Sequence, residues 1–424
     1  MALMSAAKAG VAAKSIAAES RILLKVPSHV AAEQSKSFFW PCLDVRAIHP
    51  PMQANLAELR RFFAGSRAVA FWLFAVAAIV FGMVALGGLT RLTGSGLSIT
   101  QWDPIMGAIP PMSDAAWHAA FAKYQQIPQY RLENHGMTLE GFKAIFWWEW
   151  THRLLGRIVG FAFAVPCLLF FWTGAIRRAE WPRMLLLFAL GGLQGVVGWW
   201  MVMSGLETRV SVSQYRLAIH LGVAIILLGA LLWMALEYLR TETPSPPRSG
   251  GEGWGEGVSA ASAAAATPSP RPLPHMRGGE GVAYLLTGLI YLQMLLGALV
   301  AGLHAGLVYN TWPSMDGRLF PELSFTWTSF FEDPGLAQFD HRIGAYIVFI
   351  VALTLAFRVR KARPSPQAVN ASGIVAALTV SQVVLGIVTL VSQAPVALAA
   401  AHQLTAAALF CAAVWQAFEL KQSR

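Results

Sequence analysis

The sequence Glu-Trp-Thr-His-Arg-Leu-Leu-Gly-Arg, residues 149–157, opens an apolar stretch that continues to Trp172. It places a carboxylate, an imidazole and two guanidiniums at the beginning of a segment long enough to cross a membrane. Ionisable groups at that depth are costly and usually mark a functional site. Glu149 and His152 are three residues apart and share one face of a helix, whereas Arg153 is turned by about 100°. The rest of the chain is expected to bring further histidines beside this one.

The composition is that of a polytopic membrane protein. Of the 424 residues, 56% are hydrophobic and only 13% are charged, and the mean hydropathy is +0.51. The net charge of +10 does not indicate nucleic acid binding, because Lys and Arg cluster in an N-terminal tail and in short loops, where membrane orientation explains them. The three cysteines lie in that tail and in two separate apolar stretches, which predicts neither disulfides nor a thiolate metal site.

Eight apolar stretches have the length that a bilayer crossing needs, about 20 residues. The basic loops all fall on one side of the resulting topology, which predicts that this side and both termini are cytoplasmic in a bacterial inner membrane. The predicted spans are residues 68–90, 148–175, 183–204, 216–239, 282–303, 338–358, 371–392 and 396–418.

The chain divides into two membrane domains and two connecting segments. Residues 1–66 are predicted to be a largely disordered N-terminal extension, and residues 241–281 a cytoplasmic low-complexity linker that cannot bury a core. Residues 67–240 and residues 282–420 each contain four predicted spans. The predicted fold class is therefore an all-α integral membrane protein with eight transmembrane helices.

The two membrane domains repeat each other in sequence. The matched positions are His152 and His341, Arg153 and Arg342, and His220 and His402. Four spans per repeat is an even number, so both repeats enter the membrane from the same side and the repeat is parallel. The expected architecture is two parallel-repeat four-helix bundles.

The four matched histidines are predicted to lie at one depth, within about two turns of the outer ends of their helices. The second and fourth helices of an antiparallel bundle can face each other across its core, so each domain can aim two imidazoles at one point. Two neutral imidazoles without nearby cysteines suit the two axial positions of a heme iron. Zinc is disfavoured because its sites need three or four converging ligands. Any one of these histidines, taken alone, would more often be a hydrogen-bonded structural residue.

Arginines follow the first histidine of each pair. Arg153 and Arg342 are placed to reach heme propionates, where a forked guanidinium pairs with a carboxylate.

The two domains differ one turn before these histidines, where Glu149 in the first corresponds to Gln338 in the second. A carboxylate beside one pocket and its neutral isostere beside the other predict that the first pocket performs chemistry and the second holds a cofactor. A buried Glu can act as a base or stabilise positive charge on a substrate. The alternative is a structural Glu149, solvated or paired with Arg153 or Arg157.

Four motifs in this chain resemble those of the heme A synthase family. They are residues 149–157, Gly88 to Trp102, Tyr309 to Gly317, and Asp340 to Arg342. The resemblance runs from about residue 68 to 420 apart from the linker, and the motifs occur in the family's order. Residues 91–147 and 304–337 contain no cysteine, so the chain resembles the proteobacterial and mitochondrial branch, which lacks a loop cysteine pair.

The resemblance implies an oxidoreductase of heme A biosynthesis, which oxidises the C8 methyl group of heme o to a formyl group by two hydroxylations and loss of water. The product, heme a, serves cytochrome oxidase assembly. The implied roles are His152 and His220 as ligands of the substrate heme, His341 and His402 as ligands of a heme b cofactor, Arg153 and Arg342 beside the hemes, and Glu149 assisting at the substrate. The implied partners are heme o, heme o synthase, an electron-transfer protein and the lipid bilayer.

Two other functions fit the residues. A bis-histidine diheme membrane electron carrier would contain two b hemes, although four histidines at one depth disfavour a relay across the membrane. A heme carrier without turnover would exchange its heme easily. Gly191 and Gly195 in the third predicted span form a ridge of small residues that allows packing against another helix, either within one subunit or between subunits of a homo-oligomer.

Overall fold

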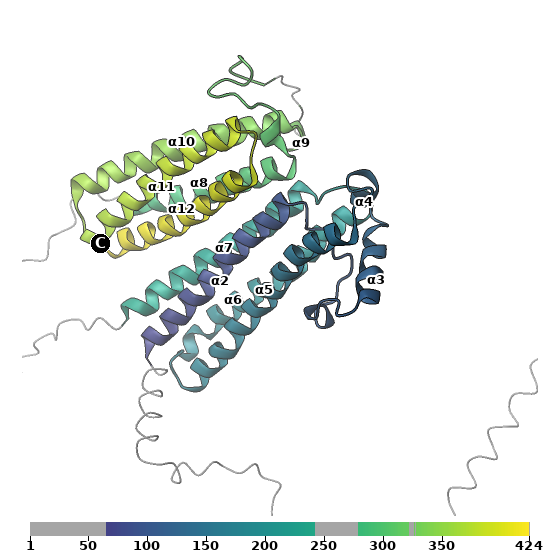
Figure 1. Ribbon diagram of the computed structural model, residues 1–424. Coiled ribbons are helices and arrows are strands. Elements are labelled where there is room, and N and C mark those ends of the chain that lie inside the picture. Colours follow the sequence, from purple (N-terminus) through teal and green to yellow (C-terminus); the bar gives the residue numbers. More distant parts are fainter. Residues whose placement is uncertain (1–64, 242–278, 322–325, 327, 424) are drawn as a thin grey trace, which may run out of the picture. The chain divides into compact units, whose positions relative to one another are not determined.

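The structure is a computed structural model that describes residues 65–241, 279–321, 326 and 328–423 (Figure 1). All of these lie in one compact unit, residues 58–424. The predicted N-terminal extension and linker fall almost entirely outside the described residues.

The long helices agree with the predicted spans in number and place. Each is apolar and long enough to cross a membrane, and the described residues form no strand. The chain is therefore an all-α multi-pass membrane protein. The bounds are α2 Ser66–Leu92, α5 Leu139–Trp172, α6 Trp181–Leu206, α7 Gln214–Arg240, α8 Gly279–Gly302, α10 Pro334–Ala362, α11 Pro366–Val391 and α12 Val396–Gln422.

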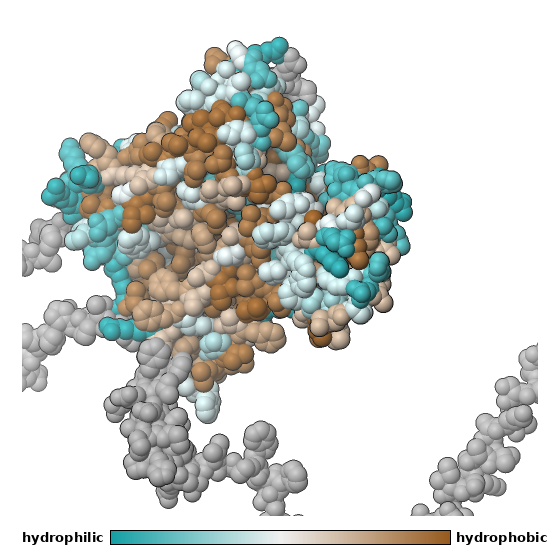
Figure 2. Space-filling model, viewed as in Figure 1, coloured by the Kyte–Doolittle hydropathy of each residue, from teal (hydrophilic) through white to brown (hydrophobic). Residues whose placement is uncertain are grey.

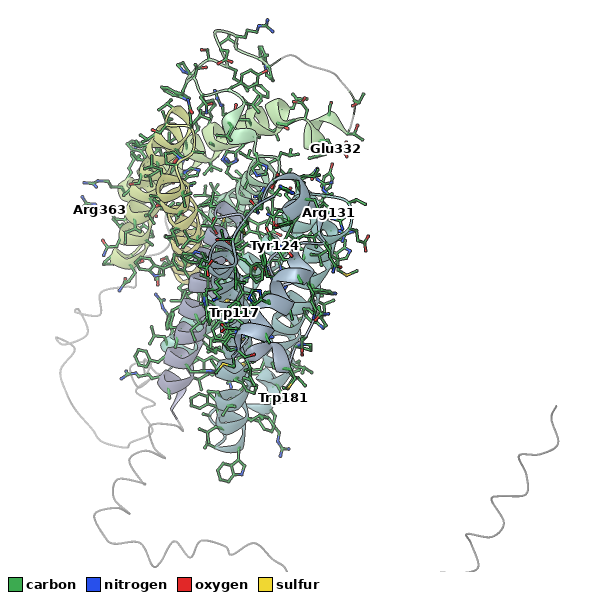
Figure 3. All side chains as sticks on the ribbon, turned by 45° about the vertical axis from the view of Figure 1, so that its right-hand side comes forward. Trp117, Tyr124, Arg131, Trp181, Glu332 and Arg363 are labelled. Atoms are coloured by element: carbon green, nitrogen blue, oxygen red, sulfur yellow. The ribbon has the colours of Figure 1, made fainter. Side chains whose placement is uncertain are left out.

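The surface has the distribution of polarity that a bilayer requires. Apolar residues cover the middle of the helices, and hydrophilic residues gather at both ends (Figure 2). Glu332 and Arg131 lie toward one end, and Trp181 and Arg363 toward the other (Figure 3). The apolar middle is where lipid tails would contact the protein.

Helix α5 begins at Leu139, whereas the sequence predicted a start at residue 148. The prediction was wrong because the added turns are stabilised by the loop before them and not by lipid. The Thr138 hydroxyl caps the helix by accepting a hydrogen bond from the Gly141 N–H at 3.2 Å. Phe142 and Phe146 then pack edge-on against Trp117 of α3, Asp114–Tyr124. His152 consequently lies about four turns into its helix and not within two.

The long helices pack in two groups of four. Helices α2, α5, α6 and α7 contact one another in a closed ring, and α8, α10, α11 and α12 do the same. The groups also touch, because α7 contacts α8, and α12 contacts both α2 and α7 (Figure 1). That the groups are parallel repeats of one unit stays a prediction from the sequence.

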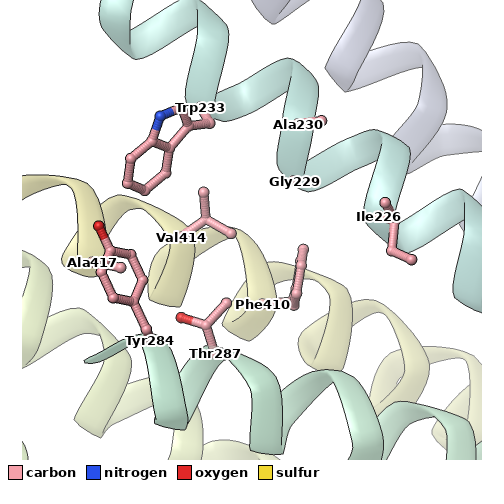
Figure 4. A pocket seen from close by; sticks show the side chains of 9 residues that line it. All are labelled: Ile226, Gly229, Ala230, Trp233, Tyr284, Thr287, Phe410, Val414 and Ala417. Atoms are coloured by element: carbon pink, nitrogen blue, oxygen red, sulfur yellow. The ribbon is translucent and has the colours of Figure 1, made fainter. Parts of the chain in front are cut away.

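An apolar groove of about 390 Å³ lies between the groups, lined by α7, α8 and α12. Trp233 and Tyr284 stand on opposite walls of the groove (Figure 4). Trp233 follows His220 by more than three turns of α7, so the groove lies away from the histidines.

Candidate functional site

The structure brings the predicted histidine partners together in both groups. The rings of His341 on α10 and His402 on α12 lie 6.4 Å apart, centre to centre, with their planes at 79°. In the first group, His220 on α7 lies near His152 on α5. All four side chains are half-buried.

The histidine pairs fit a heme better than a bare metal ion. Two imidazoles that bind one iron from opposite sides have centres roughly 6 Å apart, since each metal–nitrogen bond is about 2 Å long. Within the described residues, no group of three or more His, Cys, Asp or Glu side chains could hold a metal ion. A macrocycle supplies the remaining ligands and leaves two axial positions.

The ring nitrogens have few hydrogen-bond partners. The Nδ1 atoms of His152, His220 and His402 are buried and have no hydrogen-bond partner. They lie on the side of the ring that faces the neighbouring helix, and Nε2 is the nitrogen farther from that helix. Nε2 of His402 lies 3.4 Å from the Gln382 amide. Nδ1 of His341 differs, because the Gln293 amide of α8 lies 3.0 Å from it.

Glu149 is buried, with only 3% of its surface exposed, and both of its carboxylate oxygens are engaged. One oxygen accepts hydrogen bonds from the Ser98 hydroxyl at 2.7 Å and the Ile99 N–H at 2.8 Å. The other accepts from Arg153, through Nη2 at 2.6 Å and Nε at 3.1 Å. Pairing with Arg153 was the structural alternative for this residue, and Arg157 instead donates to loop carbonyls, those of Asp103 and Pro104.

Gln338 occupies the equivalent place on α10 and is buried to the same extent. Its amide nitrogen donates to the carbonyls of Ala305 at 3.0 Å and Tyr309 at 3.2 Å. Its amide oxygen accepts from Arg342 at 3.3 Å. The second group therefore carries no carboxylate at this position.

The two predicted propionate arginines hold the loops in place. Arg153 donates to the carbonyls of Ile99 and Gln101 as well as to Glu149. Arg342 donates to three carbonyls of the loop after α8, those of Tyr309, Thr311 and Ser314. A propionate would have to share these donors, and its contact with either arginine stays a prediction.

The loop after α2 forms a folded cap beside Glu149. Tyr124 is fully buried there, donates to the Gln129 side chain at 3.1 Å and accepts from Asn134 at 2.7 Å. Burial raises the pKa of Tyr124, so the phenol stays neutral. Gln129 in turn donates to the Gly94 carbonyl at 3.0 Å. These bonds fix the segment from which Ser98 and Ile99 reach Glu149.

A hydrogen bond joins the two groups of helices near the histidines. Gln403, the residue after His402, donates to the Val84 carbonyl of α2 at 2.7 Å. A β-carbon at Gly88 would lie 1.9 Å from the Gln403 side chain. About one turn further along α2, Arg91 donates to the Ala301 carbonyl at the end of α8 at 3.1 Å. Burial, and secondarily Arg91, lowers the pKa of the adjacent His304.

Several of these residues were not predicted from the sequence, chiefly Ser98, Gln293 and Gln403. The predicted small-residue ridge has open space beside it, because a β-carbon at Gly191 would meet no other described residue within 4 Å and one at Gly195 would meet only Trp102, at 3.9 Å. One signal for Gln293 was available: Gln-x-x-x-Gly occurs at residues 194–198, 293–297 and 382–386.

The chain is similar to known proteins along most of its length. The family model COX15-CtaA, described as "Cytochrome oxidase assembly protein", matches residues 70–414. The heme A synthase of Parvibaculum lavamentivorans is 46% identical over 361 residues, which cover 84% of this chain and 95% of that protein. That of Chelativorans sp. is 44% identical over 374 residues, covering 87% and 94%. That of Bradyrhizobium diazoefficiens is 44% identical over 357 residues, covering 82% and 91%.

Proposed function

Since the chain belongs to the COX15-CtaA family of cytochrome oxidase assembly proteins, we propose that it is a heme A synthase. The reaction would be oxidation of the C8 methyl group of heme o to a formyl group, giving heme a. One observation carries the proposal for this chain: of two similarly placed histidine pairs, only the first has a buried carboxylate, Glu149, one turn away.

In this proposal the first group of helices holds the substrate. His152 and His220 would bind the iron of heme o and so hold the macrocycle beside Glu149, while contacts at its periphery would decide which edge faces the carboxylate. The carboxylate is held by Ser98, Ile99 and Arg153, so it needs little rearrangement during the reaction. Its negative charge would stabilise positive charge that develops on the substrate, or accept a proton from it.

The second group would hold heme b between His341 and His402. Heme b, when bound, would supply a one-electron redox centre through which the four electrons removed from the methyl group could pass, one at a time, to the proposed electron-transfer partner. Gln338 adds no charge beside this pair. Arg342 and, in the first group, Arg153 are our candidates for contacts with propionates.

We place the histidine ends of the helices on the outer side of a bacterial inner membrane, with both termini cytoplasmic. The support is the positive-inside rule: Arg177, Arg178, Arg240, Arg358 and Arg360 all lie at the other ends of their helices. Heme o synthase, which makes the substrate, and an electron-transfer protein are the proposed partners.

The pigments of the purified protein test the proposal. They are extracted and separated by chromatography, and a heme A synthase should yield heme b together with heme o or heme a. Two equivalents of heme b would favour the diheme electron carrier, and heme that exchanges freely would favour a carrier protein. The Glu149→Ala variant is then assayed in membranes. Conversion of heme o at the normal rate would reject a catalytic role for Glu149.

A further inference from the structure

Each of the four histidine rings lies against a glycine of the neighbouring helix. His152 faces Gly87 of α2, His220 faces Gly198 of α6, His341 faces Gly297 of α8, and His402 faces Gly386 of α11. The ring atom nearest the glycine is Cε1 in every case, followed by Nδ1 and then Nε2. The four rings therefore meet their glycines in the same orientation.

These contacts leave no room for a side chain. A β-carbon would lie 3.0 Å from Cε1 of the ring at Gly87 and Gly198, 3.1 Å at Gly297 and 2.9 Å at Gly386. Contacts this short force either the ring or the helix to move by a few tenths of an ångström. An imidazole between its own helix and the bare backbone opposite has few other orientations.

The pattern follows the chain in a regular order. Glycine, histidine, glycine, histidine occurs on α2, α5, α6 and α7, and again on α8, α10, α11 and α12. In both groups the glycine stands on the helix that precedes its histidine among the long helices. An arrangement that occurs four times, always with Cε1 foremost, is not explained by general helix packing.

We propose that Gly87, Gly198, Gly297 and Gly386 are positioning residues that set the rotation of the four imidazoles about their side-chain bonds. The inference rests on the proposed heme ligation. The direction of an imidazole nitrogen toward the iron depends on this rotation, and groups that orient metal ligands commonly affect metal retention by roughly 10- to 100-fold.

The contact between Gly87 and His152 differs from the other three in the residue one turn before the glycine. A glutamine stands one turn before the glycine on α6, α8 and α11, as Gln194, Gln293 and Gln382, but α2 has Met83 there. The Gln293 amide lies against Nδ1 of His341 at 3.0 Å. Beside His152 the glycine thus acts without a polar neighbour at this position, so we expect substitution at Gly87 to disturb its pair more than substitution at Gly297.

The chain offers a matched control on every helix involved. A β-carbon added at Gly82 on α2, Gly191 on α6, Gly288 on α8 or Gly373 on α11 would meet no other described residue within 4 Å. Replacing these glycines by alanine adds the same methyl group to the same helix without touching a ring. Each test variant, such as Gly297→Ala, is therefore compared with a control, here Gly288→Ala.

The measurements are the heme content per protein, the low-spin EPR signal of the oxidised protein, and the rate of heme transfer to excess apomyoglobin. We expect Gly297→Ala and Gly386→Ala to lose heme b roughly 10-fold faster than the wild type, with shifted EPR g-values and first-site pigments at the wild-type level. Gly87→Ala and Gly198→Ala should instead lose the first-site pigment faster than the wild type and keep heme b at the wild-type level. The control variants should behave as the wild type.

The possible outcomes distinguish a failure of the proposed heme A synthase function from a failure of the proposed role of the glycines. Wild-type protein without heme would refute the proposed function itself. Wild-type heme content together with test variants that match their controls would overturn only the inference about glycines. If no test variant accumulates while all four controls do, the glycines are needed for folding and not for ligand orientation, which also overturns it.

Discussion

Glu149 and Gln338 occupy the same place in the two groups of helices, yet their hydrogen bonds run in opposite directions. Glu149 accepts from a hydroxyl and an N–H of the loop after α2. Gln338 donates to two carbonyls of the loop after α8. Both also contact the arginine one turn later, Arg153 or Arg342.

The difference shows that the backbone of each loop offers the hydrogen-bonding groups that its buried side chain needs. A buried carboxylate needs donors, and the loop at Ser98 and Ile99 supplies them. A buried amide can satisfy carbonyls, and the loop at Ala305 and Tyr309 presents them. The change from carboxylate to amide is therefore accompanied by a different backbone arrangement and is not a neutral replacement.

Removal of one histidine from either pair should have the largest effect. With His341→Ala we expect complete loss of heme b and retention of the first-site pigment, because one axial ligand is gone and a methyl group cannot replace it. With His152→Ala we expect heme b alone. Pigment chromatography and the heme-to-protein ratio measure both, and loss of both hemes from either variant would show that the pairs do not bind independently.

The Glu149→Gln substitution should come next. The amide keeps the size of the side chain but removes the charge, so we expect conversion of heme o to fall roughly 100-fold. Heme b content should not change. The ratio of heme a to heme o in membranes measures the effect, and an unchanged ratio would reduce Glu149 to a residue that only fixes the loop.

The reverse substitution, Gln338→Glu, should mainly affect stability. A carboxylate there would face the carbonyl oxygens of Ala305 and Tyr309, and Arg342 would compensate it only in part, so we expect a loss of about 3 kcal/mol. Thermal unfolding in detergent measures this loss. Gln338→Met is the control, since it removes the same hydrogen bonds without adding charge. Equal stability of both variants would mean that the loop tolerates a carboxylate.

Ser98→Ala should have the smallest effect of the four. It removes one hydrogen bond to a charged group, worth about 1.5 kcal/mol, while Ile99 and Arg153 continue to hold Glu149. We expect a melting temperature lower by a few degrees and a smaller loss of conversion than with Glu149→Gln. Ser95→Ala, which removes a hydroxyl bonded to Thr93 at 2.7 Å, is the comparison. A loss of activity equal to that of Glu149→Gln would mean that Ser98 itself takes part in the reaction.

The spans and the histidine partners were predictable because both depend on one-dimensional features. A stretch of about 20 apolar residues is sufficient to identify a crossing, and equivalent positions in two repeats identify His152 with His341 and His220 with His402. The Glu149 and Gln338 difference was visible for the same reason.

The remaining features depend on contacts between distant segments. The early start of α5 requires the packing of Phe142 on Trp117, which sequence periodicity does not reveal. The direction of the Gln338 bonds depends on how the loop after α8 turns its carbonyls. The four facing glycines could not be assigned before the neighbours of each helix were known, since the Gln-x-x-x-Gly pattern includes Gly297 but not Gly87, and both meet a ring.

The adjacent glycines 87 and 88 give α2 two close contacts in different directions. Neighbouring residues on a helix point about 100° apart, so Gly87 meets His152 of one group while Gly88 meets Gln403 of the other. Gln403 is covalently next to His402. The backbone of α2 therefore lies between a histidine of the first pair and the residue next to a histidine of the second, and an electron passing between the pairs along this line would have to tunnel through it.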